Sequence, residues 1–271
     1  YFDIGEEDED GLRRYGHSKD SRPDRPQIVI GLAATRRGLP VRCWVLPGNT
    51  NDASVVEQVQ ADLAGWRLNR VVWVMDRGFT GETQRVALQR GGGQVIMGER
   101  LRGGEATNHA ALDRAGRYRQ VRDNLELKEV TLTEGSETRR FVVVRNPKEA
   151  ERDRLRREKL VADLEQRLEQ LNKSLRKRQG KHSKGICELK THPLYGRYLR
   201  ELKSGELQVD RERVNDEEKL DGKYLLSTTD PSLSAEDVAL GYKQLIDVER
   251  AFRTMKTELD LRPLYHRLDA R

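Results

Sequence analysis

Two carboxylates, with cationic and phenolic groups near one of them, are the residues of this chain that could do chemistry. Asp76 ends the apolar run VVWVM, and Arg77 follows it directly. Glu249 lies in the stretch YKQLIDVERAFRTMK, where Tyr242, Glu249 and Lys256 share one face of a predicted helix. An apolar stripe adjoins that face, so we expect Glu249 at the edge of the buried side of the helix. A carboxylate at a strand end and another on a late helix are what a two-metal phosphoryl-transfer site requires, because carboxylates hold the metal ions.

Each carboxylate taken alone has a simpler structural interpretation. Asp76 could cap a turn with Arg77 as its partner, and Glu249 could form an ordinary i,i+4 ion pair with Arg253. Only the pair of carboxylates favours a metal site. Oxygen ligands select Mg²⁺ or Mn²⁺. Arg253 and Lys256, one and two turns beyond Glu249, would then face phosphates rather than acids.

The elements that must position these groups follow from the apolar pattern of the first hundred residues. Two β-rich runs with a short Gly-containing link predict a hairpin. The last strand before Asp76 is all apolar, the type that is buried on both faces of a sheet. The order hairpin, helix, strand, helix, strand predicts an α/β core with a mixed sheet. The expected strands are 27–35, 39–48, 70–75 and 94–98, and the expected helices are 52–66 and 81–89.

The pattern changes after residue 100. Residues 117–145 alternate like antiparallel strands, and 148–178 form a long charged helix with a coiled-coil-like leucine seam. A further strand is expected at 221–230. Ser234 then begins a helix that breaks and restarts into a final helix near 241–259.

The composition excludes a membrane protein and gives a weak preference for polyanionic partners. The chain has 271 residues, a formal net charge of +6 and a pI of about 9.3. No apolar run approaches the roughly 18 to 20 residues of a membrane span, and no signal peptide is visible. Cys43 and Cys187 are far apart and fit no metal spacing, so we expect a cytoplasmic protein.

The motifs together resemble the DDE transposases of bacterial insertion sequences. The similar group carries a β-strand insertion and a Tyr-Arg-Glu-Lys signature, spaced Y-x2-R-x3-E-x6-K, around its third carboxylate. This chain has Tyr242, Glu249 and Lys256 at that spacing, with Leu245 where the signature has Arg. DRGF, which begins at Asp76, is similar to the family's second-Asp motif. The stretches PGNTND, YGHSKD and DGKYLL also resemble this family, and the order of the motifs covers nearly the whole chain.

The resemblance implies a fold, an activity and partners. The fold class is α/β, an RNase H-like mixed sheet flanked by helices and interrupted by a β-rich plus long-helix insertion. Residues 1–100 and 223–271 would form the core, and 101–222 the insertion. The implied activity is metal-dependent cleavage and strand transfer at transposon ends, with Mg²⁺ or Mn²⁺ as cofactor. The implied partners are double-stranded DNA, as transposon ends and target, and a second copy in a synaptic homodimer.

The resemblance also implies roles for individual residues. Asp76 and Glu249 would be catalytic metal ligands. Leu245 removes one contact to the DNA backbone that the signature Arg would make. The residues expected to contact DNA are Tyr242, Lys256, Arg253 and Arg77, and the weaker candidates for the site or for DNA are Asp3, Arg250, Lys19 and His17.

The first carboxylate of the site is the main departure from the family. In the family it lies on the first core strand, a few residues before a segment like Tyr1-Phe2, so we expect it upstream of this chain. Asp3 is the only candidate within the visible strand. The run YFDIG reads as the end of a strand already under way, which predicts a fragment. Two alternatives stay open: an inactive DNA-binding remnant, and a hydrolytic nuclease of the same fold.

Overall fold

The computed structural model describes residues 1–8, 10–18, 20–35, 39–66, 71–77, 93–134, 137–177 and 184–265. The chain divides into two compact units. Unit 1 comprises Tyr1–Arg100, Thr131–Val142 and Leu226–Arg271. Unit 2 comprises Leu101–Val130 and Val143–Leu225. The predicted helix at 81–89 and the phenylalanine of DRGF lie outside the described residues.

The predicted hairpin is confirmed, and it forms a two-stranded sheet of its own. Strands β1 (Ile28–Ala34) and β2 (Pro40–Pro47) pair antiparallel. Helix α1 (Asp52–Ala64) follows, and the Asn51 side chain caps it by accepting a hydrogen bond from the Ser54 N–H. Trp44 and Leu46 of β2 pack on Val59 of α1, which gives the hairpin one covered face.

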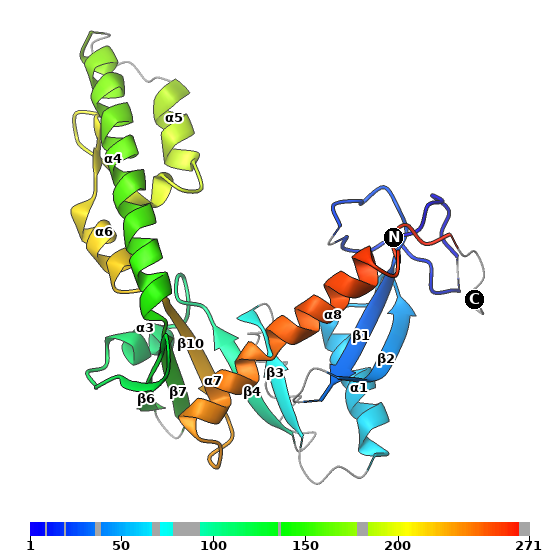
Figure 1. The fold of residues 1–271 in the computed structure, drawn as a ribbon. Coiled ribbons are helices and arrows are strands. Elements are labelled where there is room, and N and C mark those ends of the chain that lie inside the picture. The colour runs from blue at the N-terminus through cyan, green and yellow to red at the C-terminus, as the bar shows by residue number, and fades with distance from the viewer. Residues whose placement is uncertain are drawn as a thin grey trace. The chain divides into compact units, whose positions relative to one another are not determined.

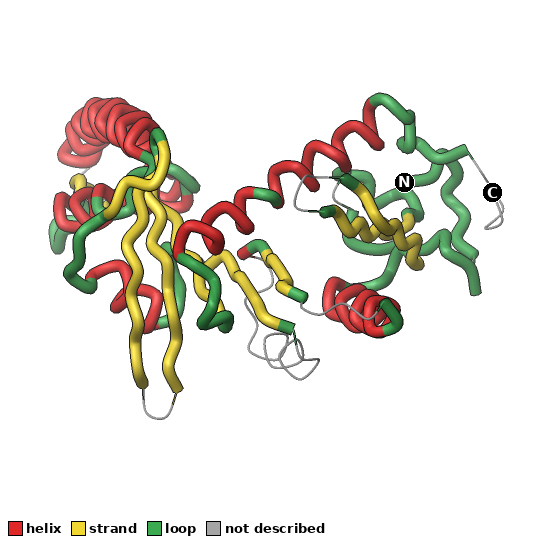
Figure 2. Tube along the Cα trace, turned by 60° about the horizontal axis from the view of Figure 1, so that its bottom comes forward, coloured by secondary structure: helices red, strands yellow, loops and turns green. Residues whose placement is uncertain are grey.

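A six-stranded mixed sheet has β3 (Val72–Met75), the strand that precedes Asp76, at one edge (Figure 1). Strand β3 pairs parallel with β4 (Gln94–Glu99), whereas β5 (Arg119–Arg122) and β6 (Leu125–Glu134) pair antiparallel. The long strands β6 and β7 lie side by side (Figure 2). With its flanking helices, this mixed sheet is consistent with an RNase H-like transposase fold. In spatial order the strands are β3 (Val72–Met75), β4 (Gln94–Glu99), β10 (Lys223–Thr228), β7 (Glu137–Arg145), β6 (Leu125–Glu134) and β5 (Arg119–Arg122).

Strand β3 is less buried than its composition predicts. Met75 is buried and packs with Val95 and Met97 of β4, but the rest of β3 is only half-buried. The prediction of a strand buried on both faces is therefore wrong for β3, which lies at one edge of the sheet. The central strand β7 shows that pattern instead, with Phe141 to Val144 fully buried.

Two consecutive helices of unit 1 carry the signature residues. Helix α7 (Ala235–Lys243) begins at Ser234, whose hydroxyl accepts from the Asp237 N–H, as predicted. Helix α7 packs against β3 and β4. The helix breaks at Gln244, and α8 (Leu245–Thr257) follows. The signature is thus divided: its tyrosine is on α7, and its glutamate and lysine are on α8.

Unit 2 is organised around the long helix α4 (Pro147–Lys177) (Figure 1). Its predicted apolar seam is confirmed at Leu164 and Leu168, which are buried against elements of the same unit. The covering segments are α5 (Lys184–Thr191), the 3-10 turn η2 (Gly196–Tyr198), β8 (Leu199–Glu201) and β9 (Leu207–Val209). The other helices described in unit 2 are α3 (Ala106–Asp113) and α6 (Arg211–Glu218).

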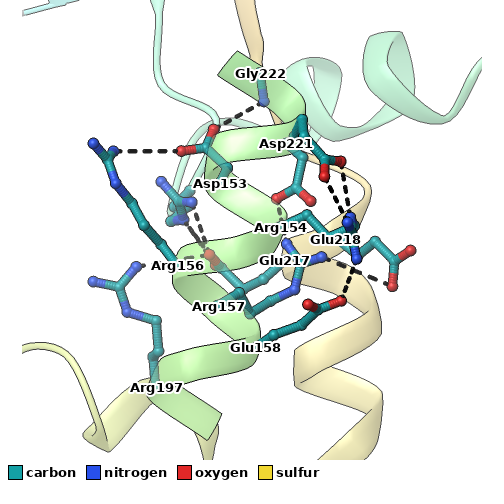
Figure 3. Close-up of polar contacts among 12 residues, drawn as sticks. Asp153, Arg154, Arg156, Arg157, Glu158, Arg197, Glu217, Glu218, Asp221 and Gly222 are labelled. Atoms are coloured by element: carbon teal, nitrogen blue, oxygen red, sulfur yellow. Dashed lines mark hydrogen bonds and ion pairs between the residues drawn. The ribbon is translucent and has the colours of Figure 1, made fainter. Parts of the chain in front are cut away.

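Ion pairs join the first turns of α4 to the segment that follows α6 (Figure 3). The Arg157 side chain is only 7% exposed, and its guanidinium donates a hydrogen bond to the Asp221 carboxylate. The Asp153 carboxylate accepts the Gly222 N–H at 2.9 Å. Gly222 has φ +61, and a Cβ there would lie 2.8 Å from the Ala150 Cα, so glycine is required at this approach.

The run YFDIG forms no regular strand in this structure. Phe2 makes an isolated parallel bridge to Leu264, in which the Leu264 N–H donates to the Tyr1 carbonyl at 2.8 Å. The expectation that this run ends a longer strand stays a prediction. Within the described segments, none of the helices has the length and apolar character needed to cross a bilayer.

Candidate active site

Asp76 lies immediately after β3, where its carboxylate receives two hydrogen bonds on one oxygen. The backbone N–H of Arg77 donates to Oδ1 at 2.7 Å. The hydroxyl of Tyr242, 166 residues later in the chain, donates to the same oxygen at 2.7 Å. Asp76 itself is exposed. The strand-tip motif and the first residue of the signature therefore meet, so Asp76 has a second partner besides the turn that the simpler interpretation gave it.

A glycine in β4 makes this contact between Asp76 and Tyr242 sterically possible. A Cβ at Gly98 would lie 2.9 Å from both the Cε2 and the Cζ atoms of the Tyr242 ring. Gly241 directly precedes Tyr242 on α7, and a Cβ there would lie 3.2 Å from the Cδ1 atom of Ile96 in the same strand. Sequence reasoning missed Gly98. The signal that could have found it is a glycine inside a strand pattern, which often marks the close approach of another group.

The electrostatics of the pair favour a charged carboxylate and a neutral phenol. Burial alone would raise the pKa of Asp76, but the bond from Tyr242, the Arg77 N–H and the Arg77 charge outweigh it, and the pKa lies below its ordinary value. Burial, then the hydrogen bond to Asp76 and its charge, raise the pKa of Tyr242 to about 12. At neutral pH the phenol is therefore a donor to an ionised Asp76.

Glu249 is exposed on α8, which differs from the predicted position at the edge of a buried face. The reason is that the neighbouring apolar residues Val248, Phe252 and Met255 are themselves only half-buried. The i,i+4 ion pair of the simpler interpretation is absent: across the described ranges, no salt bridge joins Glu249 to Arg253. Glu249 therefore presents a carboxylate to solvent on the same helical face as Arg253 and Lys256.

The two predicted ligand residues carry carboxylates of the type that suits a hard cation. Carboxylate oxygens are the ligands that Mg²⁺ and Mn²⁺ prefer, and the side chains of Asp76 and Glu249 are both exposed. In the part of the chain that the structure describes, no three His, Cys, Asp or Glu side chains gather into a metal-binding group. The residues described by the structure therefore contain carboxylates of a suitable type but no group of three such side chains.

Lys256 is held by a residue that sequence reasoning missed. Its Nζ lies 3.0 Å from Oδ1 of Asp20, and an Arg262 guanidinium nitrogen lies 2.8 Å from the same oxygen. Burial alone would raise the pKa of Asp20, but the hydrogen bonds and charges of Lys256 and Arg262 lower it overall. Asp20 belongs to YGHSKD, one of the stretches that resemble the family, whereas no motif pointed to Arg262.

The remaining predicted residues lie at the surface. Arg77 and Arg253 are exposed, and Arg250 pairs with Asp247 at 3.3 Å. His17 is exposed, and its carbonyl accepts from the Gln27 side chain at 3.2 Å. Lys19 lies outside the described residues.

Asp3 and Leu245 have defined positions. Asp3 is exposed, and its backbone N–H donates to the Leu264 carbonyl at 3.1 Å. As far as the chain is described, the Asp3 carboxylate belongs to no acidic cluster with Asp76 and Glu249. Leu245 is the first residue of α8, directly after the helix break.

Two of the stretches that resembled the family pack against each other. The Gln27 side chain donates to the carbonyls of His17 and Gly48, at 3.2 and 3.1 Å. A Cβ at Gly16 would lie 2.8 Å from the Gly48 carbonyl carbon, so this approach requires glycine. The loop that carries Asp20 is thereby fixed to the turn after β2.

The resemblance drawn from the sequence motifs agrees with a comparison against protein families. The model of the transposase DDE domain matches residues 4–271. The chain belongs to the transposase DDE domain family. No curated protein and no solved structure gives a match. As a transposase domain, the chain belongs to the enzymes of DNA transposition, which act on DNA and generally use divalent metal ions.

Proposed function

We propose that this transposase domain catalyses metal-dependent cleavage and strand transfer at the ends of a mobile DNA element, with Asp76 and Glu249 as catalytic metal ligands. The observation that carries the proposal is the 2.7 Å hydrogen bond from Tyr242 to Asp76. It joins the strand-tip carboxylate to the segment Y-x2-L-x3-E-x6-K that contains Glu249. The arrangement supports the more specific assignment to the insertion-sequence group with the Tyr-Arg-Glu-Lys signature.

In this proposal the chain's own side chains orient the reacting groups. Tyr242 fixes the Asp76 carboxylate through its hydroxyl, with Arg77 beside it. Glu249 and Asp76 would hold Mg²⁺ or Mn²⁺, which when bound activates a water or a DNA 3′-hydroxyl for in-line attack on a phosphodiester. Arg253 and Lys256, four and seven residues beyond Glu249 on α8, would contact backbone phosphates near the reacting bond.

A third carboxylate is needed to complete such a site. We propose that it lies on a strand that precedes Tyr1 in the full protein, with Asp3 as the weaker candidate. In the same proposal residues 1–100 and 223–271 form the catalytic core and 101–222 the insertion. The partners are transposon-end and target DNA and a second copy of the chain, and the reaction takes place in the cytoplasm, at the nucleoid when DNA is bound.

Two observations favour a second candidate, a DNA-binding remnant without activity. Among the described residues Asp76 and Glu249 belong to no group of three potential metal ligands, and Leu245 replaces the signature Arg. This candidate predicts DNA binding without cleavage. A hydrolytic nuclease of the same fold would cleave without joining the ends, so the products of the reaction separate all three functions.

The test is cleavage of transposon-end DNA by the full-length protein in Mg²⁺ or Mn²⁺. Asp76→Ala and Glu249→Ala are each expected to lower the cleavage rate by at least about a thousandfold, since metal ligation contributes several kcal/mol to the transition state. DNA binding should persist in both variants. Glu258→Gln is the matched control, because Glu258 is an exposed acid just beyond α8. Wild-type cleavage in either alanine variant would contradict the proposal.

A further inference from the structure

The cations Lys256 and Arg262 share a single carboxylate oxygen of Asp20, although the three residues come from distant parts of the chain. Lys256 is in the last turn of α8, Arg262 follows that helix, and Asp20 lies in the loop before β1. The Lys256 nitrogen lies 3.0 Å and the Arg262 nitrogen 2.8 Å from the same Asp20 oxygen, so the distance between the two nitrogens cannot exceed the sum of these values. That spacing suits the two free oxygens of one phosphate.

The exposures show which members of this group face solvent. The Asp20 side chain is 17% exposed, whereas those of Lys256 and Arg262 are each 38% exposed. The carboxylate therefore lies deeper than the two cations. Within the described residues each cation spends one hydrogen bond on Asp20. An ammonium has three donors and a guanidinium five, so both keep donors for a ligand, and two positive charges against one negative leave a net positive site.

The backbone around these residues holds them in place. Asp260 has φ +47 and turns the chain after α8, and Leu264 is hydrogen-bonded to Tyr1 and Asp3. The loop that carries Asp20 is closed by reciprocal backbone bonds between Arg14 and Gln27, at 3.2 and 2.8 Å. Both the turn after α8 and the loop with Asp20 are therefore anchored by backbone hydrogen bonds. The two cations are held in position before a ligand binds, which lowers the entropy cost of binding.

We propose that Lys256 and Arg262 form a two-pronged phosphate site for the DNA backbone and that Asp20 is its positioning residue. The inference rests on the proposed function, because it takes the ligand to be DNA. Lys256 lies seven residues beyond Glu249 on the same helical face, about 10 Å along the axis. The bound phosphate is therefore within a few nucleotides of the reacting bond. The signature has an Arg where this chain has Leu245. Arg262 restores the number of cations, but from a different position in the chain.

The test measures binding of a labelled mixed-sequence DNA duplex of about 30 base pairs to the full chain over a range of NaCl concentrations. Lys256→Gln and Arg262→Gln should each weaken binding several-fold and reduce the slope of log affinity against log salt by about one, as expected for one lost phosphate contact. Asp20→Asn should also weaken binding, although it adds a positive charge. Thermal unfolding of each variant is recorded in parallel.

Asp24→Asn is the matched control for Asp20→Asn. Asp24 lies in the same loop, pairs with Arg22 at 2.7 Å and is 58% exposed, and its loss adds the same charge. Simple electrostatics predicts equal or tighter binding for this variant. In a Lys256→Gln/Arg262→Gln background, Asp20→Asn should cause no further loss. A merely structural role for Asp20 would persist in that background.

The outcomes separate this inference from the function on which it rests. If Lys256→Gln leaves DNA affinity unchanged, the DNA contact of the proposed function fails. If Lys256→Gln weakens binding while Arg262→Gln changes neither affinity nor salt slope, the two-pronged site is overturned and the proposed function stands. Tighter binding by Asp20→Asn, equal to that of Asp24→Asn, would overturn the positioning role. Should Asp20→Asn unfold, the Arg262→Gln result decides the inference.

Discussion

The two units use the same residue types in opposite ways. In unit 2 the Arg157 guanidinium and the Asp221 carboxylate are 7% and 14% exposed, and they tie α4 to the segment after α6 (Figure 3). In unit 1 Lys256 and Arg262 are 38% exposed over a shielded Asp20, and Glu249 is open to solvent. A buried ion pair stabilises the fold, because removal of one partner leaves the other charge buried and unpaired. A half-exposed excess of cations keeps donors available for a ligand.

The leucine seam of α4 and the signature face of α8 show the same contrast. Leu164 and Leu168 are buried by elements of their own unit. No residue of α8 is buried: most of its apolar residues are partly covered, and Ile246 is exposed. Helical periodicity is present in both helices, so periodicity alone does not distinguish a helix that supports a core from one that presents functional groups.

The largest effect expected from this comparison is on stability in unit 2. Arg157→Gln should lower the free energy of unfolding by roughly 3 kcal/mol, because it leaves the carboxylate of Asp221 shielded and without its cation. Urea denaturation followed by circular dichroism measures the change. Arg156→Gln is the control: that side chain is 77% exposed and 3.9 Å from Asp153, and its loss should cost within about 0.5 kcal/mol. Equal losses of unfolding free energy in the two variants would show that the buried ion pair of Arg157 is no more important for stability than the exposed Arg156.

A smaller loss of stability is expected in unit 1 from Gly98→Ala. The added methyl would lie 2.9 Å from two ring carbons of Tyr242, so the ring must move away from Asp76. We expect a cost of about 1–3 kcal/mol in urea denaturation, as for other overpacked sites, together with slower DNA cleavage. Gly65→Ala should not destabilise, because the nearest atom there is the Asp62 carbonyl oxygen at an ordinary 3.5 Å. Unchanged stability and cleavage in Gly98→Ala would show that the position of the Tyr242 ring does not depend on the absence of a side chain at residue 98.

The smallest effect concerns acid stability around Asp20. Because its pKa is lowered in the folded protein, ionised Asp20 stabilises the fold above its unfolded pKa of about 3.9, and this contribution is lost as pH falls through the folded value. The stability difference between wild type and Asp20→Asn should therefore be constant from about pH 7 to 5 and shrink below about pH 4. Urea titrations at each pH measure it. In a Lys256→Gln/Arg262→Gln background the pH dependence should disappear, and its persistence would argue against the ion triad.

Much of the local structure could be predicted because short-range signals determine it. Asn51 and Ser234 cap helices as their types and positions indicate, and the hairpin and α4 follow directly from apolar periodicity. The division between α7 and α8 was also visible as a break in the pattern. The degree of burial of β3 and of Glu249 could not be predicted in this way, because burial depends on which distant elements cover a face. An edge strand and a half-covered helix have the same local sequence pattern as buried ones.

The candidate site divides in the same way. The sequence by itself determined the residue types and their spacing: Asp76 at a strand end, the Tyr242, Glu249 and Lys256 series, and through them the resemblance that the family match supports. Only the tertiary structure decided the partners. The bond from Tyr242 to Asp76 over Gly98, and the shared oxygen of Asp20 under Lys256 and Arg262, join residues more than 140 positions apart. Contacts of that kind depend on how strands and helices pack, and no local pattern in the chain encodes them.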